Sequence, residues 1–340
     1  MNPLRVGVVG VGRLGQHHAR NYYENPRCEL VGVADIDAAQ GERIARAYRC
    51  KAHTDFHDLL GKVDAVSVAV PTAAHFEVAS DLMKAGVHCL VEKPICNNLR
   101  DAEALVKLSH KYNLILQVGH IEHFNVAVQK MKSLLTTPRW IECHRLGPYD
   151  PRVKDVGVVL DLMIHDVDII LRIVNKPIES IEAVGVPIIS PNEDIANARI
   201  RFEKGCIANI TVSRVTPKPM RKIRVWQEDM YMSLDYRKQQ MEIHRREKVD
   251  NPRKDEPPWK IVSTRTRLHK EEPLKLELDH FLRCVQEGQT PQTTGEQAMT
   301  ALQVVIKINE IIRETCGLYN PQLLSGAEPG TNPFAGKSDD

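Results

Sequence analysis

The chain has 340 residues, of which 42% are hydrophobic and 26% charged, and this composition excludes an intrinsically disordered or fibrous protein. Its 46 Lys and Arg side chains against 44 Asp and Glu leave a formal net charge of +2, so no global field favours nucleic acid or an anionic membrane as a partner. At roughly 150 residues per domain, the length predicts about two domains.

Up to about residue 120, short apolar runs alternate with segments of helical spacing. Several of these runs are apolar on successive residues, which is typical of strands buried on both faces of a parallel sheet. We expect strands at residues 4–9, 29–34, 65–70, 88–91 and 114–118, and helices at 16–23, 38–48, 75–85 and 100–112. The alternation predicts an α/β domain over residues 1–120, with the doubly wound parallel sheet of a Rossmann fold.

After Gly119 the pattern changes to that of an α+β domain with a largely antiparallel, open sheet, expected over residues 121–325. Strand-like runs fill residues 178–243, and turns such as the one at Gly205 separate them. The remaining expected elements are helices at 126–135, 158–174, 274–287 and 296–315 and a strand at 140–145. Residues 326–340 are rich in Gly, Pro and polar residues and predict a disordered tail.

A glycine motif, G-V-G-R-L-G, runs from Gly10 to Gly15, directly after the first strand and at the start of a helix. This is the context that a dinucleotide-binding turn requires. Gly10 permits the tight turn, Gly12 lets the backbone approach a pyrophosphate, and Gly15 allows the helix to pack closely on the strand. The amides at the helix start then face the anion. Arg13 either contacts the pyrophosphate or lies in solvent, and the plain alternative is that the glycines only make a turn.

Asp35 ends the second predicted strand, twenty residues after Gly15. A carboxylate at this position accepts hydrogen bonds from the ribose hydroxyls of NAD and repels the 2′-phosphate of NADP. Asp37 and Gln40 have the spacing of a capping box, so we assign Asp37 to the start of the next helix and Asp35 to the ligand. The alternative for Asp35 is a solvated loop residue.

The segment Glu92-Lys93-Pro94 follows the strand expected at residues 88–91. Ligands of open α/β sheets bind beyond the carboxyl ends of the strands, so Lys93 is placed to reach a cofactor or a substrate. Pro94 restricts the backbone there. A solvated surface lysine is the alternative.

The apolar helix at 158–174 carries Asp161, His165 and Asp168 at positions i, i+4 and i+7, which share one helix face. Polar groups on such a face need partners or a cavity. A histidine beside a carboxylate is the arrangement of a general base. A histidine satisfied in the core is the alternative. The H-E-x-x-H spacing of a zinc site is absent, so we predict no metal.

The eight cysteines are scattered without a C-x-x-C pair, which is typical of reduced thiols in a cytoplasmic protein. The apolar runs are shorter than the roughly 20 residues of a membrane span, and the N-terminus lacks the pattern of a signal peptide. We therefore expect a cytoplasmic protein without a membrane partner.

Six segments in order, GVVGVGRLGQHHAR, ADIDAAQ, VPTAAH, EKP, QVGHIEHFN and VVLDLMIHDVDII, resemble the glucose-fructose oxidoreductase/inositol dehydrogenase/rhizopine catabolism (Gfo/Idh/MocA) family over about residues 4–315. The resemblance implies a Rossmann domain, an α+β domain whose open sheet commonly forms oligomer contacts, and hydride transfer between a nicotinamide cofactor and a sugar or polyol carbon. It implies that Lys93 lies near the reacting hydroxyl, that His165 is the acid/base and that Asp161 supports it. The NAD site it implies consists of Gly10, Gly12, Arg13, Leu14, Gly15, Asp35, Pro71, Thr72, His75, Glu92 and Lys93.

Within the family, GHIEHFN, HRLGPYDPR and the apolar helix resemble most the UDP-N-acetylglucosamine 3-dehydrogenase group. Enzymes of that group oxidise the sugar C3 hydroxyl to a 3-keto nucleotide sugar, which an aminotransferase converts on the way to diamino-sugar lipid A. Residues 122–126 read Glu-His-Phe-Asn-Val, where the group commonly has Glu-Arg-Phe-Asn-Pro, so the role of His123 is open.

Two arginines and a tyrosine ahead of the apolar helix suit a nucleotide-sugar substrate. Arg145 and Arg152 flank a Gly/Pro loop, and arginine forks fit phosphate oxygens, while Tyr149 can stack on a ring. The expected substrate residues are Lys93, His120, Arg145, Tyr149, Arg152, Asp161 and His165. Two alternatives stay open: a dehydrogenase of a free polyol or sugar such as an inositol, and a non-catalytic dinucleotide-binding regulator. We expect a homo-oligomer, either a dimer or a tetramer.

Overall fold

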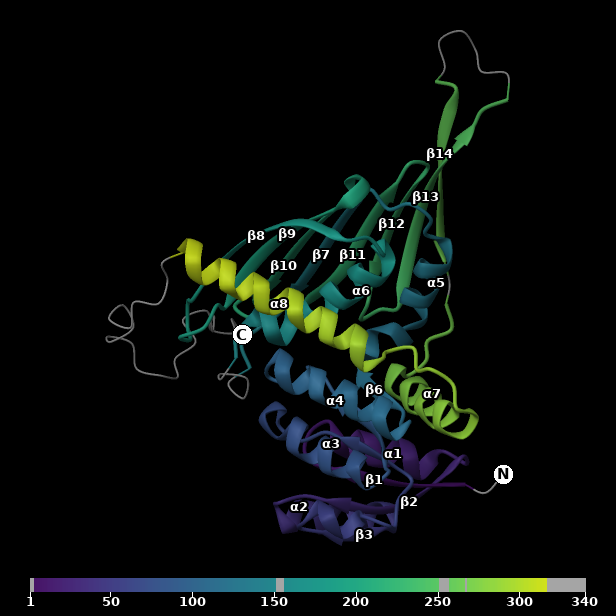
Figure 1. Cartoon of the computed structure of the whole chain (residues 1–340). Helices are drawn as coiled ribbons and strands as arrows, with labels where there is room; N and C mark the ends of the chain where they lie inside the picture. Colours follow the sequence, from purple (N-terminus) through teal and green to yellow (C-terminus); the bar gives the residue numbers. More distant parts are fainter. Residues whose placement is uncertain (1–2, 151–155, 251–256, 267, 317–340) are drawn as a thin grey trace, which may run out of the picture. The chain divides into compact units, whose positions relative to one another are not determined.

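The structure, a computed structural model, describes residues 3–150, 156–250, 257–266 and 268–316 (Figure 1). The chain forms two compact units, and each is assembled from two stretches of sequence. The first unit contains the residues up to Asn125 together with Glu271–Gln303, and the second contains Val126–Lys270 together with the residues from Val304 onward. The predicted tail at residues 326–340 lies outside the described residues.

The first unit is built on a sheet of six parallel strands in the order β3-β2-β1-β4-β5-β6. The order reverses between β1 and β4, and ligands of doubly wound sheets bind at such a switch point. The strands are β1 (Leu4–Val9), β2 (Cys28–Ala34), β3 (Lys51–His53), β4 (Ala65–Val68), β5 (His88–Glu92) and β6 (Leu116–Gly119). The helices between them are α1 (Gly15–Glu24), α2 (Ala38–Tyr48), α3 (His75–Lys84) and α4 (Leu99–Tyr112).

The predicted Rossmann domain is confirmed, with one strand missed. Every residue of β4 is buried, as are Val6 and Val8 of β1, which is why these runs are apolar on successive residues. The missed strand, β3, lies at the sheet edge, and its three residues, Lys-Ala-His, are exposed or half-buried. A strand without an apolar run leaves no periodic signal.

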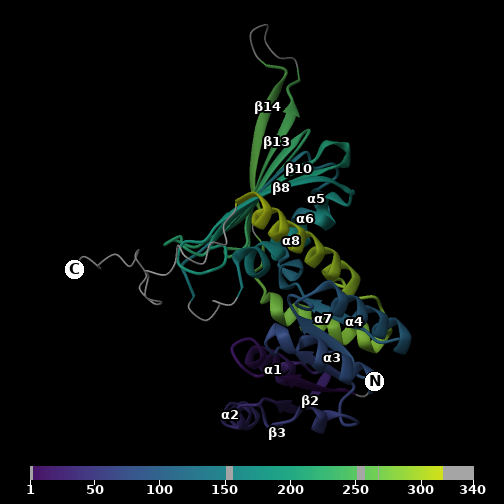
Figure 2. The same ribbon diagram turned by 60° about the vertical axis from the view of Figure 1, so that its left-hand side comes forward.

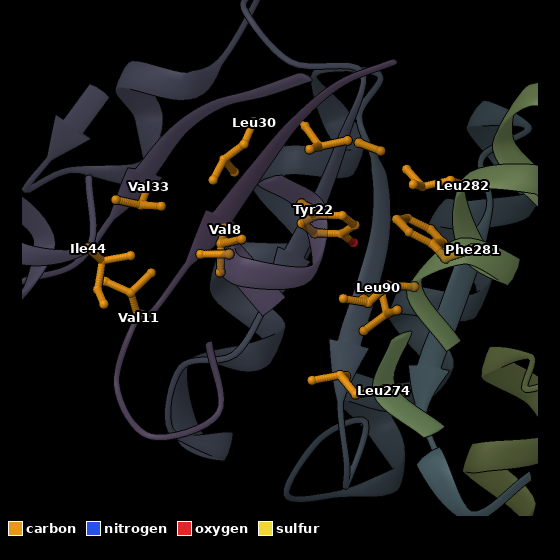
Figure 3. Close-up of a cluster of buried hydrophobic side chains, with 14 of the residues drawn as sticks. Val8, Val11, Tyr22, Leu30, Val33, Ile44, Leu90, Leu274, Phe281 and Leu282 are labelled. Carbon is orange, nitrogen blue, oxygen red and sulfur yellow. The ribbon is translucent and has the colours of Figure 1, made fainter. Parts of the chain in front are cut away.

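The predicted boundary at residue 120 misses a return of the chain to the first unit. Helix α7 (Pro273–Glu287) places Leu274, Leu278, Phe281 and Leu282 on one face, and these side chains join the core formed by β1, β5 and α1 (Figure 3). This apolar stripe, at i, i+4, i+7 and i+8, is the physical reason why α7 belongs to the first unit. The spacing is visible in the sequence, but the face it packs against is not.

The second unit is built on an eight-stranded sheet in the order β14-β13-β12-β11-β7-β10-β9-β8. Only β7 and β10 pair in parallel; the other neighbours are antiparallel. The predicted α+β domain with a largely antiparallel sheet is thus confirmed. Its strands are β7 (Trp140–Leu146), β8 (Ile178–Val186), β9 (Ile195–Phe202), β10 (Ile207–Ser213), β11 (Met220–Gln227), β12 (Met230–Asp235), β13 (Gln240–Lys248) and β14 (Trp259–Thr266).

Helices cover one face of this sheet (Figure 1, Figure 2). They are α5 (Val126–Leu134), α6 (Ile164–Val174), which directly follows a π-helical turn at Val159–Met163, and the end of α8 (Gly295–Cys316). The strands alternate accordingly: Met230, Met232 and Leu234 of β12 are buried, while the residues between them are half-buried.

The opposite face carries a row of rings in cross-strand register, formed by Trp140, Trp226, Tyr231 and His244. We call it the aromatic row. The ring centroids of Trp226 and Tyr231 are 4.8 Å apart, and those of Tyr231 and His244 are 5.3 Å apart. In the described part of the chain, no helix combines the length and the apolar composition that a membrane crossing requires.

Candidate functional site

The turn after β1 needs glycine at two of its three glycine positions for steric reasons. Gly10 has a φ of +81°, and a Cβ there would lie 2.8 Å from backbone atoms of Ala69 and Val70. A Cβ on Gly15 would lie 1.8 Å from the carbonyl oxygen of Gly10. Gly12 differs, because a Cβ there would meet no atom within 4 Å. The first and third glycines therefore build the turn, and the second leaves its backbone open to a ligand.

Helix α1 begins at this turn without a side-chain cap. Leu14 at its start makes no capping hydrogen bond, and the first turn holds no acidic residue. The positive end of the helix dipole is thus not neutralised within α1, which suits an anion. Arg13 and Leu14 are both exposed beside it.

Asp35 lies at the carboxyl end of β2 with its carboxylate oriented by two backbone N–H groups. Oδ2 accepts the N–H of Val11 at 2.7 Å, and Oδ1 accepts that of Asp37 at 2.9 Å. A carboxylate oxygen accepts more than one hydrogen bond, so both oxygens keep capacity for ribose hydroxyls. The carboxylate is therefore joined to the glycine turn rather than loosely solvated.

Asp37 caps α2 as predicted, since its Oδ1 accepts the N–H of Gln40 at 3.1 Å. The second half of the expected capping box is different. The Gln40 side chain donates to the carbonyl oxygen of Val11 at 2.5 Å, so it ties α2 to the glycine turn. The Gln40 side chain thus bonds to Val11, which is distant in the sequence, and not to the backbone N–H of Asp37 as a capping box would require.

Ile36 was not expected at the site from the sequence, and its side chain is 97% exposed. It lies between the two aspartates, directly beyond the carboxylate that is predicted to bind ribose. A large apolar side chain this exposed suits contact with a flat ring such as adenine. The only signal in the sequence is an isoleucine between two polar loop residues.

His75 ties together the loops that follow β4 and β5. Its side chain is buried, Nδ1 lies 2.9 Å from the carbonyl oxygen of Pro94, and Nε2 lies 3.0 Å from that of Val70. Burial lowers the pKa of His75, against the raising effect of these carbonyls. The imidazole ring thus links the backbone at Val70, after β4, to the backbone at Pro94, after β5. Pro71 and Thr72, predicted to contact the cofactor, lie between these loops and are exposed and half-buried.

Glu92 precedes the predicted catalytic lysine and contacts both His18 and the backbone of Lys93. Its Oε1 lies 2.9 Å from Nε2 of His18, and its Oε2 accepts the N–H of Lys93 at 3.3 Å. Burial alone would raise the pKa of Glu92, but the neighbouring His18 and Lys93 outweigh it and hold the pKa below its ordinary value. A Cβ on Gly119 would lie 2.9 Å from Glu92 Oε2, so the carboxylate fills the space that Gly119 leaves.

A second carboxyl group near Glu92, that of Glu277 on α7, was not expected from the sequence. It is fully buried, and neither side-chain oxygen has a hydrogen-bond partner among the described residues. Burial, and then the charge of Glu92, raise the pKa of Glu277 well above its ordinary value. Two neighbouring carboxyl groups with pKa values pushed apart make Glu92 the anion and Glu277 the neutral acid.

In the second unit, the predicted helix at 158–174 begins as the π-helical turn rather than as an α-helix. Asp161 lies in that turn and His165 in the first turn of α6, and both are half-buried. Such turns occur often at functional sites. The third member of the expected face, Asp168, is buried and pairs with Arg172 at 3.3 Å. Of the three residues expected on this helix face, Asp168 is therefore part of an ion pair, whereas Asp161 and His165 are half-buried.

Arg145, expected to bind a substrate phosphate, is buried in the second unit. Its Nε and Nη2 donate to the two carboxylate oxygens of Asp166 at 2.8 and 3.1 Å. Its guanidinium also lies over the ring of Tyr236, 5.2 Å from the centroid. The ion pair therefore anchors α6 through Asp166. A substrate phosphate could bind the Arg145 guanidinium only by competing with this buried bidentate pair.

The remaining expected substrate residues come from both units. Tyr149 is half-buried, with the Arg214 guanidinium 5.6 Å from its ring centroid. Arg152 lies outside the described residues. His120 follows β6 and is buried, as is His123 in the turn at Ile121–Phe124.

The predicted cofactor residues thus follow the carboxyl ends of four neighbouring parallel strands, in the order β2, β1, β4 and β5. Lys93 belongs to the first unit, and Asp161 and His165 belong to the second. Their convergence on one carbon atom stays a prediction. Among residues 3–150, 156–250, 257–266 and 268–316, no group of three or more His, Cys, Asp or Glu side chains is arranged to hold a metal ion.

Comparison with known families gives two matches. Residues 4–120 match the GFO/IDH/MocA oxidoreductase family, described by its NAD-binding Rossmann fold. Residues 129–233 match the GFO/IDH/MocA C-terminal domain. The two matches are adjacent and fall on the first sheet and on the second.

Individual dehydrogenases also align with most of this chain. UDP-N-acetylglucosamine 3-dehydrogenase of Acidithiobacillus ferrooxidans is 38% identical over 244 residues, which are 72% of this chain and 77% of that protein. A solved structure of that enzyme has a TM-score of 0.84 at 32% identity and covers 92% of this chain and 99% of its own. The scyllo-inositol 2-dehydrogenase (NAD(+)) of Bacillus subtilis is 27% identical over an alignment that covers 91% of this chain and 94% of that protein.

Proposed function

Because the chain belongs to the Gfo/Idh/MocA family of NAD-binding oxidoreductases, we propose that it oxidises the C3 hydroxyl of UDP-N-acetylglucosamine to the 3-keto nucleotide sugar. The main structural support for NAD binding is the Asp35 carboxylate. The N–H groups of Val11 and Asp37 fix its orientation beside the glycine turn. That geometry fits the ribose hydroxyls of NAD and disfavours a 2′-phosphate. Arg13 and the uncapped start of α1 suit the pyrophosphate.

The proposed chemistry uses three side chains. Bound NAD supplies a hydride acceptor at the nicotinamide ring. Lys93 donates a hydrogen bond to the reacting hydroxyl oxygen, and His165 accepts the hydroxyl proton as the carbon loses its hydride. Asp161 orients the imidazole and stabilises the imidazolium that forms. A positioned base of this kind is worth about 10² to 10⁴ in rate.

The choice of UDP-N-acetylglucosamine rests on the relative at 38% identity. The alternative substrate is a free polyol such as an inositol, favoured by the inositol dehydrogenase that aligns along 91% of this chain at 27% identity. The downstream aminotransferase and the diamino-sugar lipid A pathway follow from the first substrate only. A cytoplasmic location is part of the same proposal, since NAD and nucleotide sugars are cytoplasmic metabolites.

The protein is further proposed to be a homo-oligomer that associates through the open face of the second sheet. The aromatic row supports this, because Trp and Tyr are enriched in protein interfaces. Arg199 adds a guanidinium 5.6 Å from the centroid of the Trp140 ring on the same face. A sedimentation measurement that finds only monomer would contradict this part of the proposal.

The test of the substrate is turnover itself. The protein is mixed with NAD and, in separate reactions, with UDP-N-acetylglucosamine, UDP-glucose or myo-inositol, and NADH absorbance is followed. An aminotransferase that consumes the 3-keto sugar is added in a parallel series, because oxidation of a sugar hydroxyl by NAD can be uphill. We expect turnover with UDP-N-acetylglucosamine to exceed that with myo-inositol by at least about a hundredfold. The reverse ratio would make the protein a polyol dehydrogenase.

A further inference from the structure

The helix that carries Asp161 and His165 is held at its start by a loop that is distant in the sequence. Val158 begins the π-helical turn and provides no side-chain cap. Instead, the N–H of Val158 donates to the carbonyl oxygen of Glu193 at 3.0 Å, and the N–H of Val159 donates to Glu193 Oε1 at 3.1 Å. Glu193 therefore satisfies two of the N–H groups that a helix start leaves without partners.

The Glu193 carboxylate also occupies the space above Gly157. A Cβ on Gly157 would lie 1.9 Å from Glu193 Oε1 and 2.3 Å from Oε2. The carbonyl oxygen of Gly157 in turn accepts the N–H of Asp161 at 3.1 Å. Two contacts thus lead from the Glu193 carboxylate to the backbone of Asp161.

The loop that presents Glu193 is itself held in place by buried charges. Asp194 Oδ2 accepts three backbone N–H groups, those of residues 188, 189 and 190, at 2.6 to 2.9 Å. Its Oδ1 accepts Nε of Arg214 at 2.7 Å. Arg214 also donates to the carbonyl oxygen of Val156 at 2.8 Å. Residues 156–159 are therefore held by Glu193 of this loop and by Arg214, which is itself paired with Asp194 of the same loop.

We propose that Glu193 is a positioning residue for the reaction, because its hydrogen bond to Val159 and its contact with Gly157 set where Asp161 stands relative to His165. The inference rests on the proposed function, in which Asp161 orients the His165 imidazole. Carboxylate placement matters there, since a misplacement of about 1 Å in a catalytic site can cost about a hundredfold in rate. Glu193 itself touches neither cofactor nor substrate in this proposal.

The charged groups around Glu193 come from two other elements. Burial raises the pKa of Glu193, while the N–H of Val159 and the charges of Arg214 and Arg313 oppose that rise. Arg214 follows β10, and Arg313 lies on α8. The role assigned to Glu193 needs only an acceptor oxygen, so a glutamine that keeps this oxygen should replace it.

The experiment compares E193A and E193Q in the full chain, with UDP-N-acetylglucosamine and NAD as probes. We expect kcat of E193A to fall at least about tenfold, with KM for the sugar and affinity for NAD changed less than about twofold. E193Q should return kcat to within about threefold of the wild type, because its amide oxygen can accept the Val159 N–H. The matched control is E203A, which removes an exposed glutamate of the turn at Glu203–Gly205 and should behave as wild type.

The pH profile of kcat separates positioning from simple stability. A carboxylate beside a histidine raises the pKa of that histidine, so displacing Asp161 should move the acidic limb of E193A to lower pH. D161N should move it in the same direction. A folded E193A with wild-type kcat, an unmoved acidic limb, or no rescue by E193Q overturns the inference. Where E193A does not fold, E193D replaces it, since the shorter side chain cannot reach the Val159 N–H. Full turnover in D161N would instead overturn the proposed function.

Discussion

The two halves of the candidate site are built in opposite ways. In the first unit, the cofactor half is local and mostly backbone: a glycine turn, an uncapped helix start and a carboxylate only 24 residues from the turn residue it binds. In the second unit, the helix with Asp161 and His165 is held by charged side chains from distant strands and loops, such as Arg145 and Glu193. A ligand-binding turn can therefore be encoded in a short motif, whereas the placement of reactive side chains depends on long-range contacts.

The largest expected effect concerns the buried Arg145–Asp166 pair of the second unit. R145M leaves Asp166 buried without its partner, so the free energy of unfolding should fall by about 3 to 5 kcal/mol, measured by urea denaturation. R145M/D166L, which removes both charges, should recover part of the loss. A stable R145M protein with a raised KM for the nucleotide sugar would show instead that Arg145 binds phosphate.

The next largest effect is expected at the reactive side chains themselves. H165A and K93M should each lower kcat by at least about a hundredfold, because each loses a group that acts in the transition state. NAD affinity, measured by fluorescence titration, should change little in H165A. Full activity in both variants would contradict the mechanism.

Two glycine variants test whether Gly15 is needed to form the turn and whether Gly12 is needed to let the ligand approach the backbone. G12A adds a Cβ where no atom lies within 4 Å, so the variant should melt at the wild-type temperature but bind NAD at least about tenfold more weakly. G15A adds a Cβ 1.8 Å from a carbonyl oxygen and should destabilise the first unit. Equal melting temperatures for G12A and G15A would contradict this division of roles.

Cofactor choice gives a smaller effect. D35S removes the carboxylate that repels a 2′-phosphate, so the ratio of kcat/KM for NAD over NADP should fall about tenfold. D37S, which alters only the helix cap, is the control and should keep the ratio. An unchanged ratio in D35S would mean that another residue selects NAD.

The smallest effect is expected for Glu277. Its raised pKa means that the folded protein keeps a proton that the unfolded chain releases above the ordinary glutamate pKa. The contribution of Glu277 to the stability of the wild type should therefore fall as the pH rises from about 5 to about 8. E277Q cannot ionise, so its stability relative to the wild type should increase over that range in thermal melts. A difference that is constant with pH would show that Glu277 is ionised in the fold.

Much of the fold follows from local pattern. The strand at Leu4–Val9 and the helix at Ala38–Tyr48 have the predicted bounds, because continuous apolar runs and a capping aspartate mark them. The return of α7 to the first unit was not predicted, since an apolar stripe does not say which core it joins. β3 and β14 were missed because edge strands have few buried residues to reveal their period.

The cofactor turn, most of the elements and the side chains proposed for hydride transfer can be read from the sequence alone. These depend on steric limits of glycine, on burial periodicity and on short spacings, which are all properties of neighbouring residues. Three contacts become visible only in the folded chain: Arg145 pairs with Asp166, Glu277 lies buried near Glu92, and Glu193 caps the turn that contains Asp161. Charge pairing and desolvation act between groups far apart in the chain, so no local pattern specifies them.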